Sequence, residues 1–335
     1  MLARIAQELF WLGRDLTRAE HTARMLDGAF HADVAGMTGQ RGIALSWDGV
    51  LAIIGAKPPV PGERAQAPAT AAVAGVGFDG SERRTTVTSL LTLDLGSPAS
   101  ILSCVARARE RGRTLRDVIS TEMWQALNSF YLALGRYDMP SALQTGPYSV
   151  YQEVKERCAL FWGLVDRTML RDEGRAFLEA GGRIEEADMV LRMLRVTVPP
   201  EPQASPGEDE GEGEALALLQ AVGGFQAYRR AGRSAPTIGR VVRFLLYDGA
   251  YPGSVASSVE ALRDALTSAD PQPRTSPPVL RLGRLAADLE LQRRTPAEHG
   301  GLPEQLKAVQ DELEMVDRDI GARYFAIAAI AAVHL

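Results

Sequence analysis

The chain has 335 residues, enough for one large domain or two. Hydrophobic residues make up 46% and charged residues 24%, an ordinary globular composition that excludes wholesale disorder. The net charge of −5, from 42 acidic and 37 basic residues, gives no general attraction for nucleic acid, so we expect no nucleic-acid partner. Cys104 and Cys158 are too few for a disulfide framework or a cysteine-based zinc cluster, and a reducing cytoplasm is the expected location.

Neither end of the chain predicts a membrane segment. Arg4 and Glu8 interrupt the apolar positions at the N-terminus, so the uninterrupted stretch of a secretory signal is absent there. The most apolar run, residues 325–335, is about half of the roughly 20 residues that a membrane span needs. We therefore expect this run to form a buried last helix.

Most long segments repeat apolar residues every three or four positions, which predicts a mainly helical protein. In the first segment these positions share one face from Ile5 to Leu26, and Gly28 is expected to follow the end of the helix. Further helices are predicted at 88–93, 98–135, 148–170, 173–195, 214–230, 236–247, 252–267, 277–293 and 302–333. The predicted fold class is all-α, a multi-helix bundle.

The Pro-rich segments 57–70, 198–214 and 270–278 interrupt the helical pattern. Residues 198–214 are also acidic and have little to bury, so they are predicted to form a mobile loop. We interpret residues 1–335 as a single domain, with a first half at 1–147 and a second half at 148–335 that contains this loop.

An internal repeat supports that division. Residues 90–105 match 244–259, which pairs Asp94, Pro98 and Ser100 with Asp248, Pro252 and Ser254. Residues 12–26 match 180–194, which pairs Arg18 with Glu186, Glu20 with Asp188 and Arg24 with Arg192. The matches occur in the same order at offsets of 154 and 168 residues, so we expect two pseudo-repeated helical halves.

The repeated Asp-x-x-x-Pro-x-Ser element predicts a corner between two helices. Pro98 and Pro252 are expected at the first helical position, where a missing N–H is harmless. Asp94 and Asp248 are expected to accept hydrogen bonds from free amides at that helix start.

The first helix carries polar residues on a second face. Arg14 and Arg18 share it with Phe10, His21 and Met25. Buried arginines need carboxylate or ligand partners, because an unpaired buried charge is very unfavourable. Ion pairs within the bundle are the favoured interpretation, and binding of an anion is the alternative.

The predicted helix over 98–135 mixes arginines into an apolar face. Arg109, Arg113 and Arg116 lie between apolar positions, on the face that Trp124 also marks. Guanidinium groups suit recognition of phosphate or carboxylate, so the pattern predicts a polar cavity or an interface. Two alternatives stay open: this part of the helix leaves the core, or its arginines pair with acids of the chain.

Other chemistries have little support. The four histidines lack metal-ligand spacing, neither cysteine belongs to a CxxC pair, and no P-loop, GxGxxG or GxSxG motif is present. We therefore predict no metal and no cofactor.

Two segments, LARIAQELFWLGRDLTRAEHTARMLD and SILSCVARARERGRTLRDVISTEMWQALNSFYL, resemble the bacterial alpha-E proteins, an all-helical family. The resemblance extends to Trp47, the Pro-x-Ser corners and Arg323-Tyr-Phe. It implies partners: circularly permuted ATP-grasp ligases and transglutaminase-like peptidases. The family pattern carries these candidate ligand-binding residues: Arg14, Arg18, Glu20, Arg24, Arg109, Glu110, Arg113, Arg116, Ser120, Glu122, Trp124 and Asn128. Arg111 and Glu186 depart from the pattern, where the family has Asn and Arg.

Taken with the arginine pattern, the resemblance predicts a helical accessory protein of an ATP-grasp amide ligase system. Arg109, Arg113 and Arg116 are expected to face Arg14 or Arg18 around one pocket for an acidic substrate or intermediate, with Glu20 or Glu122 nearby. The alternatives are an independent enzyme that uses Arg/Glu acid–base chemistry in that pocket, with Glu20, Glu110 and Glu122 as candidates, and a non-catalytic helical scaffold.

Overall fold

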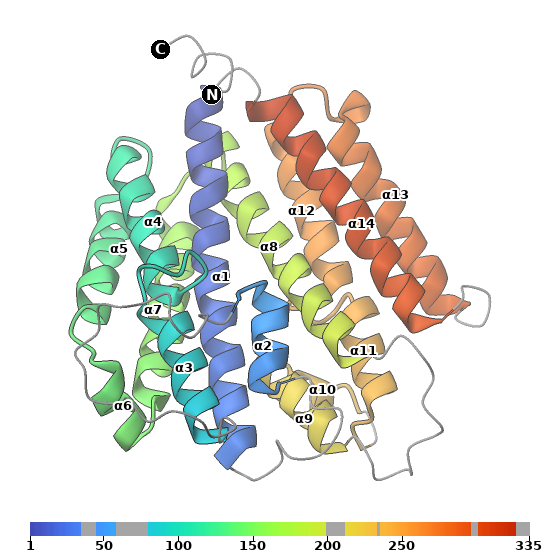
Figure 1. Ribbon diagram of the computed structural model, residues 1–335. Coiled ribbons are helices and arrows are strands. Elements are labelled where there is room, and N and C mark those ends of the chain that lie inside the picture. The colour runs from blue at the N-terminus through green and yellow to red at the C-terminus, as the bar shows by residue number, and fades with distance from the viewer. Residues whose placement is uncertain (35–44, 58–79, 199–211, 233–234, 296–300, 326–335) are drawn as a thin grey trace.

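The computed structural model describes residues 1–34, 45–57, 80–198, 212–232, 235–295 and 301–325 (Figure 1). Within these ranges the chain forms helices and no strand, which confirms the all-α prediction. The helices are α1 (Ala3–Val34), α2 (Trp47–Ile54), α3 (Gly80–Thr92), α4 (Ile101–Thr114), α5 (Thr121–Leu134), α6 (Met139–Thr145), α7 (Tyr148–Thr168), α8 (Glu173–Thr197), α9 (Glu212–Ala221), α10 (Phe225–Arg230), α11 (Ile238–Tyr247), α12 (Val255–Ala269), α13 (Pro277–Arg294) and α14 (Leu302–Ile320). A 3₁₀ turn occupies Pro273–Thr275 and a π-helical turn Gly321–Phe325.

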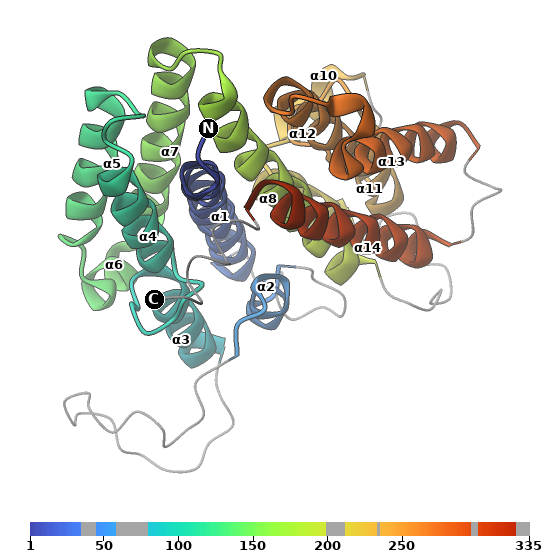
Figure 2. The ribbon, with the colours of Figure 1, turned by 90° about the horizontal axis from the view of Figure 1, so that it is seen from above.

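Two long helices, α1 and α8, form the centre of the bundle (Figures 1 and 2). On one side α1 packs against α4 and α7, with α5 outside them, and on the other side α8 packs against α12 and α14, with α13 outside them. No described helix is both long enough and apolar enough to cross a membrane. Most of residues 198–214 and 325–335, for which a loop and a last helix are predicted, lies outside the described ranges.

Glycines let the backbones of α1 and α8 touch. A Cβ added to Gly13 would overlap the carbonyl oxygen of Leu178, and one added to Gly181 would overlap that of Phe10. Only glycine fits at either position, since the overlapping atoms belong to backbone that cannot move aside. The two contacts are reciprocal, because Leu178 and Gly181 follow Phe10 and Gly13 at the same offset of 168 residues.

The two predicted corners have the same local structure. In each, the aspartate side chain accepts from the amide two residues later: Asp94 from Gly96 at 2.8 Å, and Asp248 from Ala250 at 3.1 Å. The helices begin only after Ser100 and Ser254, whose hydroxyls accept from amides three residues on. The prediction that Pro98 and Pro252 are the first helical residues is therefore wrong, and the amides of Gly96 and Ala250 lie before the helix start. Superposition of the two halves stays a prediction.

The predicted helix over 98–135 is two helices in the structure. Between α4 and α5 the chain turns so that Leu115 and Ile119 are both buried. Ser120 then caps α5, with its hydroxyl accepting from the Met123 amide at 3.2 Å. The polar and β-branched residues of the turn favour this break, and the hydrophobic face continues on a second helix.

Two smaller predictions were also wrong, and two short helices were missed. Gly28 does not end the first helix, because α1 runs on to Val34 and uses the glycine for close contact with Leu45 and Ala221. The predicted helix at 214–230 divides into α9 and α10 at Gly223, which has a positive φ of 70°. The short helices α2 and α6 were not predicted.

Asp270 joins the end of α12 to the π-helical turn after α14. Its buried carboxylate accepts from Arg323 Nε at 2.5 Å, from Arg323 Nη2 at 2.8 Å and from the Tyr324 hydroxyl at 2.6 Å. The hydrogen bonds from Arg323 are the largest cause that holds the pKa of Asp270 well below its usual range, even though burial opposes them.

Substituting Gly181 tests the contact between α1 and α8. We expect Gly181→Ala to lower the free energy of unfolding by about 3 kcal/mol or more, since the new methyl group overlaps backbone. Gly163→Ala on the exposed face of α7 is the control, and we expect it to raise stability by about 0.5–1 kcal/mol. Urea unfolding followed by circular dichroism measures both, and equal effects would contradict the contact.

Asp270→Asn tests the link between α12 and the π-helical turn. Because the pKa of Asp270 is depressed in the folded protein, its carboxylate stabilises the fold above the unfolded-state pKa of about 4. That stability is lost as the pH falls through the folded-state pKa. We expect the variant to be about 2–3 kcal/mol less stable at pH 7, with the difference from the native protein shrinking at acidic pH. Urea titrations between pH 3 and pH 7 measure this, and a pH-independent difference would refute it.

Candidate functional site

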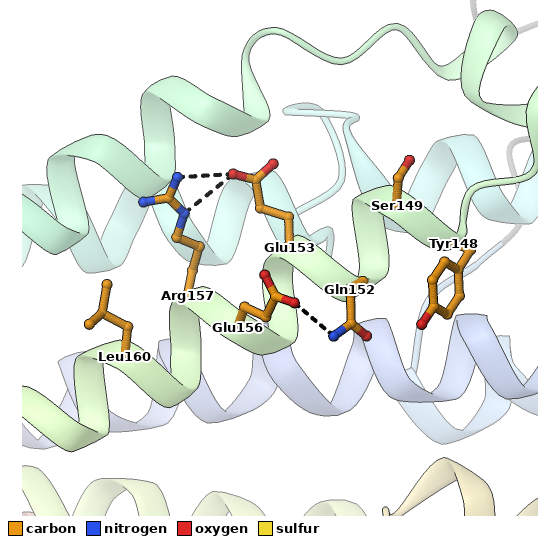
Figure 3. A pocket seen from close by; sticks show the side chains of 7 residues that line it. All are labelled: Tyr148, Ser149, Gln152, Glu153, Glu156, Arg157 and Leu160. Atoms are coloured by element: carbon orange, nitrogen blue, oxygen red, sulfur yellow. Dashed lines mark hydrogen bonds and ion pairs between the residues drawn. The ribbon is translucent and has the colours of Figure 1, made fainter.

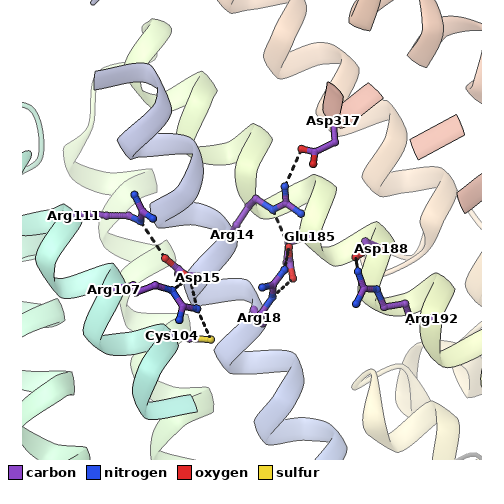
Figure 4. Close-up of polar contacts among 10 residues, drawn as sticks. All are labelled: Arg14, Asp15, Arg18, Cys104, Arg107, Arg111, Glu185, Asp188, Arg192 and Asp317. Atoms are coloured by element: carbon purple, nitrogen blue, oxygen red, sulfur yellow. Dashed lines mark hydrogen bonds and ion pairs between the residues drawn. The ribbon is translucent and has the colours of Figure 1, made fainter. Parts of the chain in front are cut away.

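Arg14 and Arg18, one turn apart on α1, hold a single carboxylate on α8 (Figure 4). Arg14 Nε lies 2.9 Å from Glu185 Oε2, and Arg18 Nε lies 2.5 Å from Glu185 Oε1. The Glu185 side chain is 0% exposed, and Arg14 Nη1 reaches Asp317 of α14 at 2.8 Å. This geometry favours the ion-pair interpretation of the two arginines.

Burial alone would raise the pKa of Glu185, but the charges and hydrogen bonds of Arg18 and Arg14 outweigh it, so the pKa is lowered. The same contacts raise the pKa of both arginines above the ordinary value, against the opposing effect of burial. Glu185 is therefore ionised and fully bonded, which suits it to hold helices together rather than to move protons.

A second pair of arginines, one turn apart on α4, holds a buried aspartate on α1 (Figure 4). Arg107 Nη2 lies 2.8 Å from Asp15 Oδ1, and Arg111 Nε lies 3.2 Å from Asp15 Oδ2. Arg111 also reaches Glu8 at 2.7 Å, and Arg107 donates to the sulfur of buried Cys104 at 3.2 Å. Burial raises the pKa of that thiol to about 12, so Cys104 is not a reactive thiolate.

The residues of the second family segment gather on the outside of α4 and α5. Arg109 donates to Asn128 at 2.9 Å and to Glu110 at 2.9 Å, and Arg113 donates to the same Glu110 at 2.9 Å. The guanidinium carbons of Arg109 and Arg116 lie 5.9 and 5.1 Å from the centre of the Trp124 ring. We call these six residues the surface cluster. Ser120 and Glu122 lie outside it, at the cap and in the exposed first turn of α5.

The expectation that Arg109, Arg113 and Arg116 face Arg14 or Arg18 is wrong. Arg113 keeps 59% of its side chain exposed, and the arginines that turn toward α1 are Arg107 and Arg111. The break between α4 and α5 is the reason in part, because the single continuous face assumed over 98–135 does not exist. The buried carboxylates Asp15 and Glu185 were not among the predicted site residues.

Glu20 and Arg24 pair with each other at 2.7 Å, near the C-terminal part of α1. Arg24 lines a cavity of about 480 Å³ between α1, α7 and α9. A larger depression of about 570 Å³ lies on the outer face of α7 (Figure 3). Its lining residues all come from α7 and largely bond one another, as in the Glu153–Arg157 pair at 3.1 Å, so it offers few free groups.

Asp188 of α8 differs from Glu185 in the direction of its pKa shift. Burial raises its pKa, the charge of Glu185 adds to this effect, and Arg192 at 2.7 Å opposes it without cancelling it. Asp188 and Arg192 repeat the Glu20–Arg24 pair of α1 at the offset of 168 residues. From the sequence, Asp188 was predicted only as the repeat partner of Glu20.

Glu185→Gln tests the buried network. The substitution removes the charge that Arg18 and Arg14 share and leaves Arg14 with Asp317, so we expect the free energy of unfolding to fall by about 3–5 kcal/mol. Glu290→Gln is a matched control, because Glu290 also binds two arginines, Arg293 and Arg294, but on the surface. We expect the control to change stability by less than about 1 kcal/mol. Chemical denaturation measures the free energy of unfolding of both variants. A decrease for Glu185→Gln as small as that of the control would rule out a structural role for Glu185.

Among curated proteins, the chain is similar to uncharacterized proteins of Mycobacterium bovis and of two strains of Mycobacterium tuberculosis. Each is 25% identical over 270 residues, which covers 78% of this chain and 29% of the relative. The chain thus spans less than a third of the length of the curated relatives it matches. No solved structure matches it.

The model of one protein family, Alpha-E, matches residues 1–325. That family is described as a predicted alpha-helical domain with a conserved ER motif. The described residues contain Glu-Arg pairs at 82–83, 110–111 and 156–157, of which 110–111 lies in the arginine-rich part of α4. Since the match spans nearly the whole length and the fold is helical throughout the described ranges, the chain belongs to the Alpha-E family.

Proposed function

We propose that the chain is a helical partner domain of a circularly permuted ATP-grasp amide ligase, the partner that its family resemblance implies. The surface cluster carries the proposal. Arginine and tryptophan dominate the binding energy of many protein interfaces, and here Arg109, Arg116 and Trp124 are held in place by stacking while they stay accessible. A transglutaminase-like peptidase is the second partner that the resemblance implies.

The length of the relatives supports a role beside other domains. In the mycobacterial proteins the matched region occupies 29% of a longer polypeptide, so there the helical region is covalently joined to further sequence. The pocket for an acidic substrate stays a prediction.

The arginines that bind the buried carboxylates Glu185 and Asp15 serve a different purpose in this proposal. Arg14, Arg18, Arg107 and Arg111 already have carboxylate partners inside the chain, so an incoming anion would have to displace Glu185 or Asp15. The four arginines therefore hold the helices in place, and the surface cluster is left to contact the partner.

The test combines the purified chain with the circularly permuted ATP-grasp protein of the same genome. We expect a complex by isothermal titration calorimetry, and ATP-dependent phosphate release that changes when the chain is added. Trp124→Ala should weaken the complex by about 30-fold or more, and Arg113→Met by about tenfold. Arg293→Met is the control for Arg113→Met, because both arginines form exposed i,i+3 pairs with glutamate.

Absence of a complex, or equal weakening by Arg113→Met and Arg293→Met, would count against the surface cluster as the contact.

The raised pKa of Asp188 supports the second candidate, an independent acid–base enzyme. Asp188→Asn separates the two functions, since it should leave ligase stimulation unchanged if the chain is a partner domain.

A further inference from the structure

The cavity between α1, α7 and α9 combines opposite charges in one small space. Its volume of about 480 Å³ is in the range of small-molecule sites. Arg24, Asp27 and His31 line it from α1, Lys155 from α7, and Leu216 and Gln220 from α9. The chain has three lysines among its 37 basic residues, and one of them is in this wall.

Lys155 and Asp27 form the central ion pair of the cavity. Lys155 Nζ lies 2.9 Å from Asp27 Oδ2, and the side chains are 18% and 15% exposed. His31 Nε2 lies 3.4 Å from the other oxygen of Asp27. Both charges are thus largely removed from water, and separating them without replacement would be unfavourable.

Arg24 adds a second cationic group beside this pair. Its Nε and Nη2 both donate to Glu20 Oε1, at 3.0 and 2.7 Å. Its Nη1 lies against Gly223, where the missing side chain leaves room, since a Cβ there would stand 2.9 Å from that nitrogen. Arg24 therefore places a guanidinium group in the cavity wall while its hydrogen bonds with Glu20 hold it in position.

These charges select a class of ligand. A simple anion that binds Lys155 would leave Asp27 as a like charge beside it, and a simple cation that binds Asp27 would strand Lys155. A zwitterion opens the ion pair and replaces both halves, with its carboxylate on Lys155 and Arg24 and its ammonium on Asp27. Leu216 offers an apolar contact and Gln220 a polar contact for the rest of the molecule.

We propose that this cavity binds an α-amino acid or a short peptide through its ammonium and carboxylate groups. As a substrate site of an amide ligase system the assignment rests on the proposed function, whereas the binding itself does not require the ligase. Such a ligand carries the amine and the carboxylate that amide synthesis joins.

Calorimetric titration of the full chain alone tests the proposal, with a panel of L-amino acids and dipeptides as probes. We expect saturable binding of at least one member. Analogues of that member that lack only the ammonium or only the carboxylate should bind at least tenfold more weakly. If every member fails to bind, or if either analogue binds as well as the parent, the proposal is overturned.

Variants locate the binding. Lys155→Met and Asp27→Asn should each weaken it tenfold or more, with circular dichroism unchanged, and Arg24→Gln carries the same test if Lys155→Met fails to fold. Lys307→Met is the control, because Lys307 also pairs with an aspartate, Asp311 at 2.6 Å, but on the exposed face of α14. Equal binding by native protein and cavity variants would refute the assignment. Ligand binding without a ligase complex would overturn only the proposed function, and a complex without ligand binding only this inference.

Discussion

Direct backbone contact between α1 and α8 is the constraint on which the rest of the structure depends. Gly13 and Gly181 bring the two helices closer than any side chain would permit. At that separation Arg14 and Arg18 reach Glu185 with direct hydrogen bonds rather than through water. The close approach of the two backbones therefore permits these direct ion pairs, and the ion pairs make it possible to bury Glu185 between the helices.

The same arrangement of arginines occurs twice across the centre of the bundle. Arg107 and Arg111 of α4 hold Asp15 of α1, and Arg14 and Arg18 of α1 hold Glu185 of α8. In each case two guanidinium groups from successive turns of one helix share one carboxylate of the next. Arginine suits this role better than lysine because its planar fork donates in fixed directions and keeps its charge when buried.

The periodicity of the sequence was enough for the helical class and for most long helices, because apolar spacing reports which face is buried. Apolar spacing did not predict the helix ends and turns that polar side chains determine. Ser120 is a residue type that caps helices, but apolar positions recur at helical spacing on both sides of it. A single helix over 98–135 was therefore predicted. Carboxylate or ligand partners were expected for Arg14 and Arg18 because a charge on a buried face needs one. Their partner Glu185 could have been found in the same way, since it lies on the buried face of α8 one turn after Gly181 and Gly182. Which arginines of α4 turn inward depends on how α4 is rotated about its axis, and the packing of α1 sets this.

The crossing of α1 and α8 also determines how the molecule can move. Side chains can change rotamer and let packed helices slide, but contacting backbones have no such freedom. Each of the two helices is enclosed by further helices on its outer side, so neither can separate without disrupting its own half of the bundle. From this packing we expect local opening among the outer helices, and slowest exchange of amide hydrogens with solvent where α1 and α8 cross. The cavity beside Arg24 lies between α1, α7 and α9, so one of its walls belongs to the central helix pair and the others to the helices packed around it.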